Sequence, residues 1–129
     1  MSDEVYRKKL VKLMQYAVVP EDSLHFTSIV VMKDGTEFSG VNVKNSVFRD
    51  AIYAEQAAIG QAITAGYKKG DFEKIYVMVG GERISDLKYI DRAVIAEIFD
   101  DDCDVVCMNL VGESITLRVD NLYSSVFNY

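Results

Sequence analysis

The run KIYVMVG (74–80) constrains the fold more than any other stretch of the sequence. From Ile75 to Val79 it is apolar, without the polar alternation of a strand that faces water on one side. This pattern is typical of a central strand covered on both faces. A sheet built around such a strand is expected to be sandwiched between helices.

The segments before this run supply a helix, a hairpin and a second helix. Apolar residues recur at helical spacing within 3–17, which predicts an amphipathic helix. In FTSIVVMKDGTEFSGVNV (26–43), Asp-Gly separates two strand-like runs and therefore predicts a hairpin. A helix with alanines along one face is expected between Asp50, as its N-cap, and Gly66, just after its end.

The segments after the central run supply one more helix and two more strands. The stretch SDLKYIDRAVIAEIF (85–99) is predicted to be a helix capped by Ser85 or Asp86. Four apolar residues would share one face of that helix: Leu87, Ile90, Val94 and Ile98. The runs CDVVCMNL (103–110) and SITLRV (114–119) are predicted to be strands.

This order of elements predicts one domain over residues 1–129, a three-layer α/β/α sandwich with a mixed five-stranded sheet. A chain of 129 residues is long enough to bury a single core, and its 50% hydrophobic composition is that of an ordinary globular protein. The net charge of −6 argues against binding to a nucleic-acid backbone. No apolar run reaches the length of a membrane span, and no charged-then-apolar leader opens the sequence. We therefore expect a cytoplasmic protein with neither nucleic acid nor membrane as a partner.

The cysteines and the histidine offer little chemistry. Cys103 and Cys107 are four residues apart in a predicted strand, roughly 13 Å at about 3.3 Å per residue, which is too far for a disulfide. We expect them to be packed thiols. His25 is the single histidine, and without a partner it makes a weak case for a metal site or a catalytic triad.

The helix AEQAAIGQAITAGY (54–67) carries one carboxylate, Glu55, beside its stripe of alanines. Two explanations stand side by side. Glu55 is either an acid–base residue or what remains of a site that has lost its chemistry.

Three motifs resemble the cytidine deaminase family over nearly the whole chain. The segment GVNVKN (40–45) is similar to the family's G-x-N-x-E-N, Ala54-Glu55 to its Cys-Ala-Glu, and LKYIDR (87–92) to its Pro-Cys-x-x-Cys-Arg. The resemblance implies a cytidine-deaminase-like fold. It also implies that three cysteines would hold a zinc ion and that the glutamate at position 55 would shuttle protons for a zinc-bound water.

The three positions that correspond to zinc ligands have changed. The resemblance places Tyr53, Lys88 and Asp91 where the family has cysteines. A neutral tyrosine binds Zn²⁺ poorly, a lysine brings a positive charge, and Asp91 with Glu55 gives only two oxygen ligands. We expect no zinc, no other metal and no cofactor.

The charges at these positions suggest how the pocket would fold without a metal. Lys88 and Arg92 balance Glu55 and Asp91, so the Lys88 ammonium is predicted to bridge the two carboxylates, with Arg92 in support. The pattern alone favours a plainer alternative, a surface pair of Lys88 and Asp91 at i, i+3.

The substrate side has changed as well. Of the family's ribose-binding pair, Asn42 remains while Lys44 replaces the glutamate, so an acceptor has become a donor. Leu24 occupies the position of an aromatic residue near the base, and Ala54 and Phe127 match substrate-side positions. An anionic group such as a phosphate would suit Lys44.

Three functions remain open. The first is a cytidine-deaminase-like protein without zinc or deaminase activity, which binds a nucleoside- or nucleotide-like molecule or acts through assembly. The second is an active nucleoside deaminase that uses Glu55 in an altered site. The third is a structural protein whose pocket has filled in. The resemblance also implies a homo-oligomer, a tetramer or dimer.

Overall fold

The structure is a computed structural model that describes residues 2–21, 23–45 and 51–124. Its main sheet has five strands in the order β2-β1-β5-β6-β7. These strands are β1 (Phe26–Met32), β2 (Glu37–Val41), β5 (Phe72–Val79), β6 (Asp104–Met108) and β7 (Ser114–Arg118). Only β5 and β6 run parallel and the other neighbours are antiparallel, so the sheet is mixed, as predicted.

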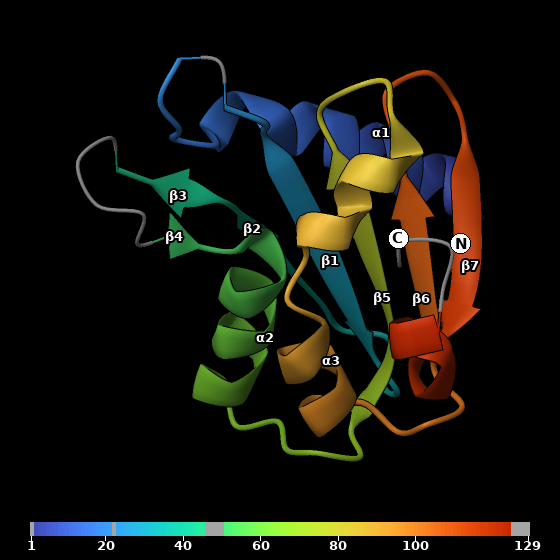
Figure 1. The fold of residues 1–129 in the computed structure, drawn as a ribbon. Helices are drawn as coiled ribbons and strands as arrows, with labels where there is room; N and C mark the ends of the chain where they lie inside the picture. Colours follow the sequence, from blue (N-terminus) through green and yellow to red (C-terminus); the bar gives the residue numbers. More distant parts are fainter. Residues whose placement is uncertain (1, 22, 46–50, 125–129) are drawn as a thin grey trace.

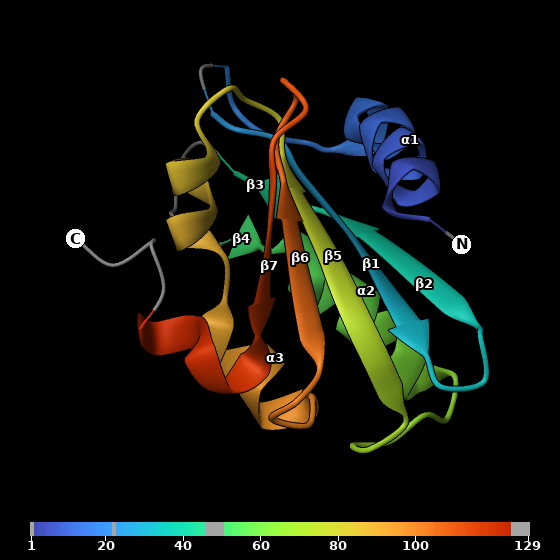
Figure 2. The same cartoon turned by 90° about the vertical axis from the view of Figure 1, so that its right-hand side faces the viewer.

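The helices form a layer on each side of this sheet. Figure 1 shows α2 (Ala54–Thr64) and α3 (Arg92–Ile98) in front of the sheet and α1 (Asp3–Leu13) behind it. Figure 2, turned by 90°, shows α1 and α3 on opposite sides. The three-layer sandwich predicted from the sequence is therefore confirmed. No helix in the described residues is long and apolar enough to cross a membrane.

The central strand β5 separates two apolar cores. Ile75 and Val77 belong to the core under α2 and α3, whereas Tyr76 and Met78 belong to the core under α1. All four side chains are fully buried. This alternation explains why the sequence run is apolar without interruption, since both faces of the strand are covered.

The predicted hairpin is present, and its turn is built from the expected residues. Strands β1 and β2 are paired antiparallel and connected by the turn at residues 33–36. In this turn the Asp34 carboxylate accepts a hydrogen bond of 2.9 Å from the backbone N–H of Thr36. Gly35 has φ of 90°, a left-handed conformation that favours glycine.

Helix α2 begins later than the sequence predicted. Its N-cap is Tyr53 and not Asp50, which lies outside the described residues. Before the helix, β4 (Ala51–Ile52) pairs with β3 (Val43–Lys44) in a small separate sheet that the sequence did not predict. The end of the helix agrees with the prediction, because Gly66 follows it with φ of 104°.

The helix predicted over 85–99 is broken in two. A 3₁₀ helix, η2 (Ile84–Tyr89), precedes an extended Ile90, and α3 follows. The cap of α3 is Asp91, whose Oδ1 accepts a hydrogen bond of 3.0 Å from Val94 N–H, and not Ser85 or Asp86. Ile95 is the fully buried residue of α3, whereas the sequence pattern places Val94 and Ile98 on the apolar face of this helix.

Two further 3₁₀ helices follow α1 and β7. The first, η1 (Met14–Tyr16), extends α1, and η3 (Val119–Ser124) follows β7. Both cysteines are free and buried, as expected.

Candidate functional site

A pocket of about 590 Å³ opens at one end of the α2 and α3 side of the sheet. Its walls come from the β3 segment, the start of α2, the residues before and at the start of β1, and the end of η2. Six residues that the sequence singled out line it together: Leu24, Asn42, Lys44, Tyr53, Ala54 and Glu55. The last predicted residue of the substrate side, Phe127, lies outside the described residues.

Glu55 lies in the first turn of α2 and is 2% exposed. Burial raises the pKa of this carboxyl to about 7, and the charge of Asp91 adds to the rise, although hydrogen bonds from the backbone N–H groups of Glu55 and Asp91 oppose it. Its Oε2 atom is buried and has no hydrogen-bond partner among the described residues. Near neutral pH this group can therefore both give and take a proton.

Asn42 holds the wall of the pocket in place. It is 8% exposed, and its Nδ2 donates a hydrogen bond of 3.0 Å to the carbonyl of Leu24 while its Oδ1 accepts one of 2.8 Å from Phe26 N–H. Its amide is thus used to fix the segment that enters β1.

Lys44 contributes an exposed cationic side chain to the pocket lining. The backbone around it is held by Val18, whose carbonyl accepts a hydrogen bond of 2.8 Å from Lys44 N–H. Lys44 is therefore carried by a fixed strand rather than by a loop.

Gln56 is a residue that the sequence did not single out. Its Oε1 accepts a hydrogen bond of 3.2 Å from Tyr53 N–H, and its Nε2 donates one of 2.7 Å to Oδ2 of Asp91. Gln56 thus joins the start of α2 to the start of α3.

The charges around Glu55 differ from the predicted arrangement. Among the ion pairs of residues 2–21, 23–45 and 51–124, none joins Lys88 to Glu55 or to Asp91. The Lys88 Nζ lies 5.2 Å from the centroid of the Tyr89 ring. The guanidinium of Arg92 donates hydrogen bonds of 3.4 Å to the carbonyls of Lys88 and Leu122. The predicted lysine bridge is therefore wrong, because η2 directs Lys88 toward the neighbouring aromatic ring.

The groups at the three family ligand positions are a poor match for zinc. Both oxygens of Asp91 already accept hydrogen bonds, one from Val94 N–H and one from Gln56. A protonated lysine has no lone pair to offer, so Lys88 cannot ligate as an ammonium. Only Asp91 and Glu55 then offer carboxylate oxygens, since the neutral phenol of Tyr53 binds zinc poorly, and two such ligands are fewer than the three protein ligands of a catalytic zinc site.

One cluster in the described part of the chain could hold a cation by spacing alone: Asp100, Asp102 and Cys103. It belongs to the other end of the sheet, since Cys103 Sγ donates to the carbonyl of Phe72 at the start of β5. The pocket instead includes Phe26, which pairs with Val79 at the end of β5. This acidic cluster is not part of the pocket.

Four further residues of the lining were missed from the sequence: Ser23, Phe26, Tyr89 and Ile90. Tyr89 and Ile90 lie between positions 88 and 91, so the family motif contained a signal for them. Lys88 and Asp91 themselves are not in the lining. Ile90, whose extended backbone breaks the predicted helix, lies between these two positions and is itself part of the lining.

Cytidine deaminases are similar to this chain in sequence, although no protein-family model matches it. A cytidine deaminase of Mycoplasma genitalium is 30% identical over 69 residues, which is 54% of this chain and about half of that protein (52%). A cytidine deaminase of Halalkalibacterium halodurans is 26% identical over 127 residues, covering 98% of this chain and 95% of that protein.

Solved structures share the fold. The cytidine deaminase of Burkholderia pseudomallei superposes with a TM-score of 0.82 and 24% identity, over 95% of this chain and 96% of the other. That of Mycobacterium leprae gives a TM-score of 0.71 and 17% identity, over 97% and 99% of the two chains.

Proposed function

We propose that this chain belongs to the cytidine deaminase family, binds a nucleoside- or nucleotide-like molecule and carries out no zinc-dependent deamination. The observation that carries the proposal is the pocket of about 590 Å³, a volume suited to a small molecule. The buried Oε2 of Glu55 supports it further, because among the described residues this atom has no hydrogen-bond partner and a polar group of a ligand could satisfy it.

The proposed absence of zinc is supported by the donor set. Asp91 is engaged by Val94 and Gln56, and Lys88 supplies a cation where a ligand would be needed. Elemental analysis of the purified protein should find less than about one zinc per ten chains. Stoichiometric zinc that stays bound through dialysis would contradict this part of the proposal.

Lys44 favours a ligand with an anionic group, such as a phosphate. An ammonium in the lining can pair with a phosphate oxygen, an interaction that a nucleoside without phosphate cannot make. We therefore expect nucleoside monophosphates to bind more tightly than the corresponding nucleosides.

A thermal-shift screen against nucleosides and nucleotides tests the binding. A ligand at about 100 times its Kd stabilises the native state by about 2.7 kcal/mol, which is readily seen as a higher Tm. Lys44→Ala should reduce the shift from monophosphates and leave that from nucleosides. Lys69→Ala is the matched control, because Lys69 pairs with Glu97 on the exposed surface. A screen with no hit at millimolar ligand would contradict the proposal.

A second candidate is an active hydrolase that uses Glu55 as general acid and base. The observation in its favour is the pKa of Glu55, about 7, which suits proton transfer near neutral pH. The loss of cytidine absorbance on conversion to uridine measures this activity. We expect no turnover above background; turnover that Glu55→Gln abolishes would establish the second candidate instead.

We also propose that the chain forms a homo-oligomer, a dimer or a tetramer, and that it is a cytoplasmic protein. The open pocket argues against the alternative in which the site has filled in, so assembly would accompany binding rather than replace it. Light scattering after size-exclusion chromatography measures the state, and a monomer at micromolar concentration would contradict assembly.

A further inference from the structure

We infer that Gln56 is a positioning residue whose side chain joins the starts of α2 and α3, the two segments that a metal would otherwise join in this fold. The inference rests on the proposed absence of zinc. The resemblance places a metal between positions 53, 88 and 91, that is, between the residue before α2 and the segment that leads into α3.

Gln56 makes the same connection with two hydrogen bonds. Its carbonyl oxygen accepts from the backbone N–H of Tyr53, at 3.2 Å, and its amide nitrogen donates to Oδ2 of Asp91, at 2.7 Å. Positions 53 and 91 are therefore linked through one side chain. The bond to Asp91 spans 35 residues of sequence, so it fixes tertiary structure and not only the end of a helix.

Asp91, on which the bond from Gln56 ends, makes further contacts of its own. The other oxygen of Asp91 caps α3 through Val94 N–H, at 3.0 Å. Asp91 also lies close enough to Glu55 for its backbone N–H and its charge to act on that carboxyl. A change at Gln56 would consequently reach both the start of α3 and the polar group at the pocket wall.

The polarity of the two bonds distinguishes this role from simple packing. Asp91 needs a donor and Tyr53 N–H needs an acceptor, and a glutamine amide supplies one of each. The substitution Gln56→Glu would place a second carboxylate opposite that of Asp91. In Asp91→Asn, an amide NH₂ would face the Gln56 NH₂, and turning either amide would cost Tyr53 N–H or Val94 N–H its acceptor.

The double variant Gln56→Glu/Asp91→Asn reverses the direction of the hydrogen bond. The new carboxylate can accept from both Tyr53 N–H and the new amide, and an asparagine at position 91 can still cap α3. We expect each single variant to lower Tm by about 4 °C or more and the double variant to recover most of the loss. Gln61→Glu is the matched control, because it makes the same substitution at an exposed position of α2.

The experiment is a double-mutant cycle measured by thermal unfolding, with and without EDTA, together with the Tm shift given by the best monophosphate of the screen. We expect EDTA to have no effect on Tm. We also expect the ligand shift to fall in both single variants and return in the double variant, which a purely local effect on helix stability would not produce.

The arms of the experiment separate the possible failures. Additive losses in the double variant would overturn the role of Gln56 whatever the metal content. The double variant could instead recover its Tm while EDTA lowers the Tm of the protein. That result would show that a metal joins these segments, and it would overturn both the proposed metal-free site and the role of Gln56 as a substitute for the metal.

Discussion

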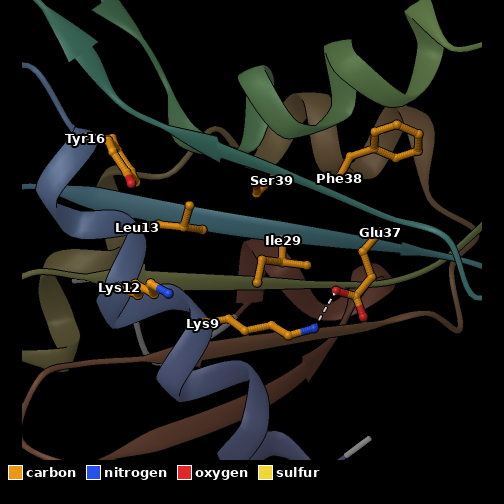
Figure 3. Close-up of a pocket in the computed structure, with 8 residues that line it drawn as sticks. All are labelled: Lys9, Lys12, Leu13, Tyr16, Ile29, Glu37, Phe38 and Ser39. Carbon is orange, nitrogen blue, oxygen red and sulfur yellow. Dashed lines mark hydrogen bonds and ion pairs between the residues drawn. The ribbon is translucent and has the colours of Figure 1, made fainter.

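Two glutamates, one on each side of the sheet, are held in opposite ways. Glu37 lies beside α1, where its Oε2 accepts a hydrogen bond of 2.6 Å from Tyr6 and its Oε1 pairs with Lys9 at 2.9 Å. Figure 3 shows this ion pair in the groove of about 340 Å³ between α1 and β2. Burial raises the pKa of Glu37, but Tyr6 and Lys9 outweigh it and the pKa is lowered. At Glu55 the effect of burial is the larger one, and the pKa of this carboxyl is raised.

The difference lies in what surrounds each carboxyl. The α1 side has a small core in which the rings of Tyr6 and Tyr76 stack at 4.2 Å, and its polar atoms reach charged partners at the edge, such as Asp3 for Tyr76 at 2.7 Å. The α2 and α3 side has the larger apolar core, and there the pKa of Glu55 is shifted by burial, by backbone N–H groups and by the charge of Asp91, with no cation among these causes in the described part of the chain. A buried acid without a cationic partner is the kind of group that marks a functional site.

The largest effect is expected where α2 approaches the sheet. A Cβ at Gly40 would meet the carbonyl oxygen of Ala54 and lie 2.6 Å from the backbone nitrogen of Ala58. Because both contacts are backbone, Gly40→Ala should lower the free energy of unfolding by more than about 3 kcal/mol and displace the helix that carries Glu55. Urea denaturation measures the change.

Gly60 on the same helix provides the control for Gly40. A Cβ there has no atom within 4 Å, so Gly60→Ala should stabilise the protein by up to about 1 kcal/mol through helix propensity. Equal losses in the two variants would contradict the close packing of α2 on β2.

The next effect concerns the pH dependence that Glu55 gives to stability. Its pKa is about 7 in the folded protein against an ordinary 4.5. The folded state therefore binds the proton more tightly, and the stability from this group is complete below pH 4.5 and lost as the pH rises through 7. The loss amounts to about 3 kcal/mol, at about 1.4 kcal/mol per pKa unit.

Glu55→Gln should remove this dependence. The variant should match the native protein near pH 4 and exceed its stability above pH 7, as measured by urea denaturation across that range. Glu97→Gln, at an exposed ion pair with Lys69, controls for the loss of a charge. Parallel curves for Glu55→Gln and the native protein would show that Glu55 ionises normally.

Glu37→Gln should act with the opposite sign. Since the pKa of Glu37 is lowered, the ionised form is favoured in the folded state, and its stabilisation is lost as the pH falls through that pKa. The variant should lose about 1 kcal/mol at pH 7, because a hydrogen bond to a charged group becomes one to a neutral group. The difference from the native protein should shrink at acid pH, and a difference that grows there would erase the contrast between the two glutamates.

Sequence patterns predicted the fold better than they predicted the site. The run 74–80 and the Asp-Gly turn indicated the sheet because burial and turn geometry leave direct traces in sequence. The pairing of β3 with β4 left none, since each strand has only two residues. The break before α3 could have been noticed from Asp91, an N-cap residue three positions before Val94.

At the site, residue types were informative and their partners were not. The resemblance singled out six residues that line the pocket, yet it gave no sign of the bond between Gln56 and Asp91, which depends on how two helices meet. Counting charges suggested a lysine bridge because four charges sum to zero. A balance of charges does not say where each side chain lies, and the Lys88 side chain on η2 lies over the ring of Tyr89.

The smallest effect is therefore expected at Lys88. A bridge to two buried carboxylates would make Lys88→Met costly, by about 3 kcal/mol or more, because it would leave those charges uncompensated. The ammonium lies 5.2 Å from the Tyr89 ring centroid at a partly buried position, where a single charge contact is worth about 1 kcal/mol or less, and methionine retains most of the apolar stem. Chemical denaturation at pH 7 should thus show a loss below about 1 kcal/mol. A larger loss that disappears in the Glu55→Gln background would restore the bridge and remove the distinction between Glu37 and Glu55, since both would then be paired with lysine.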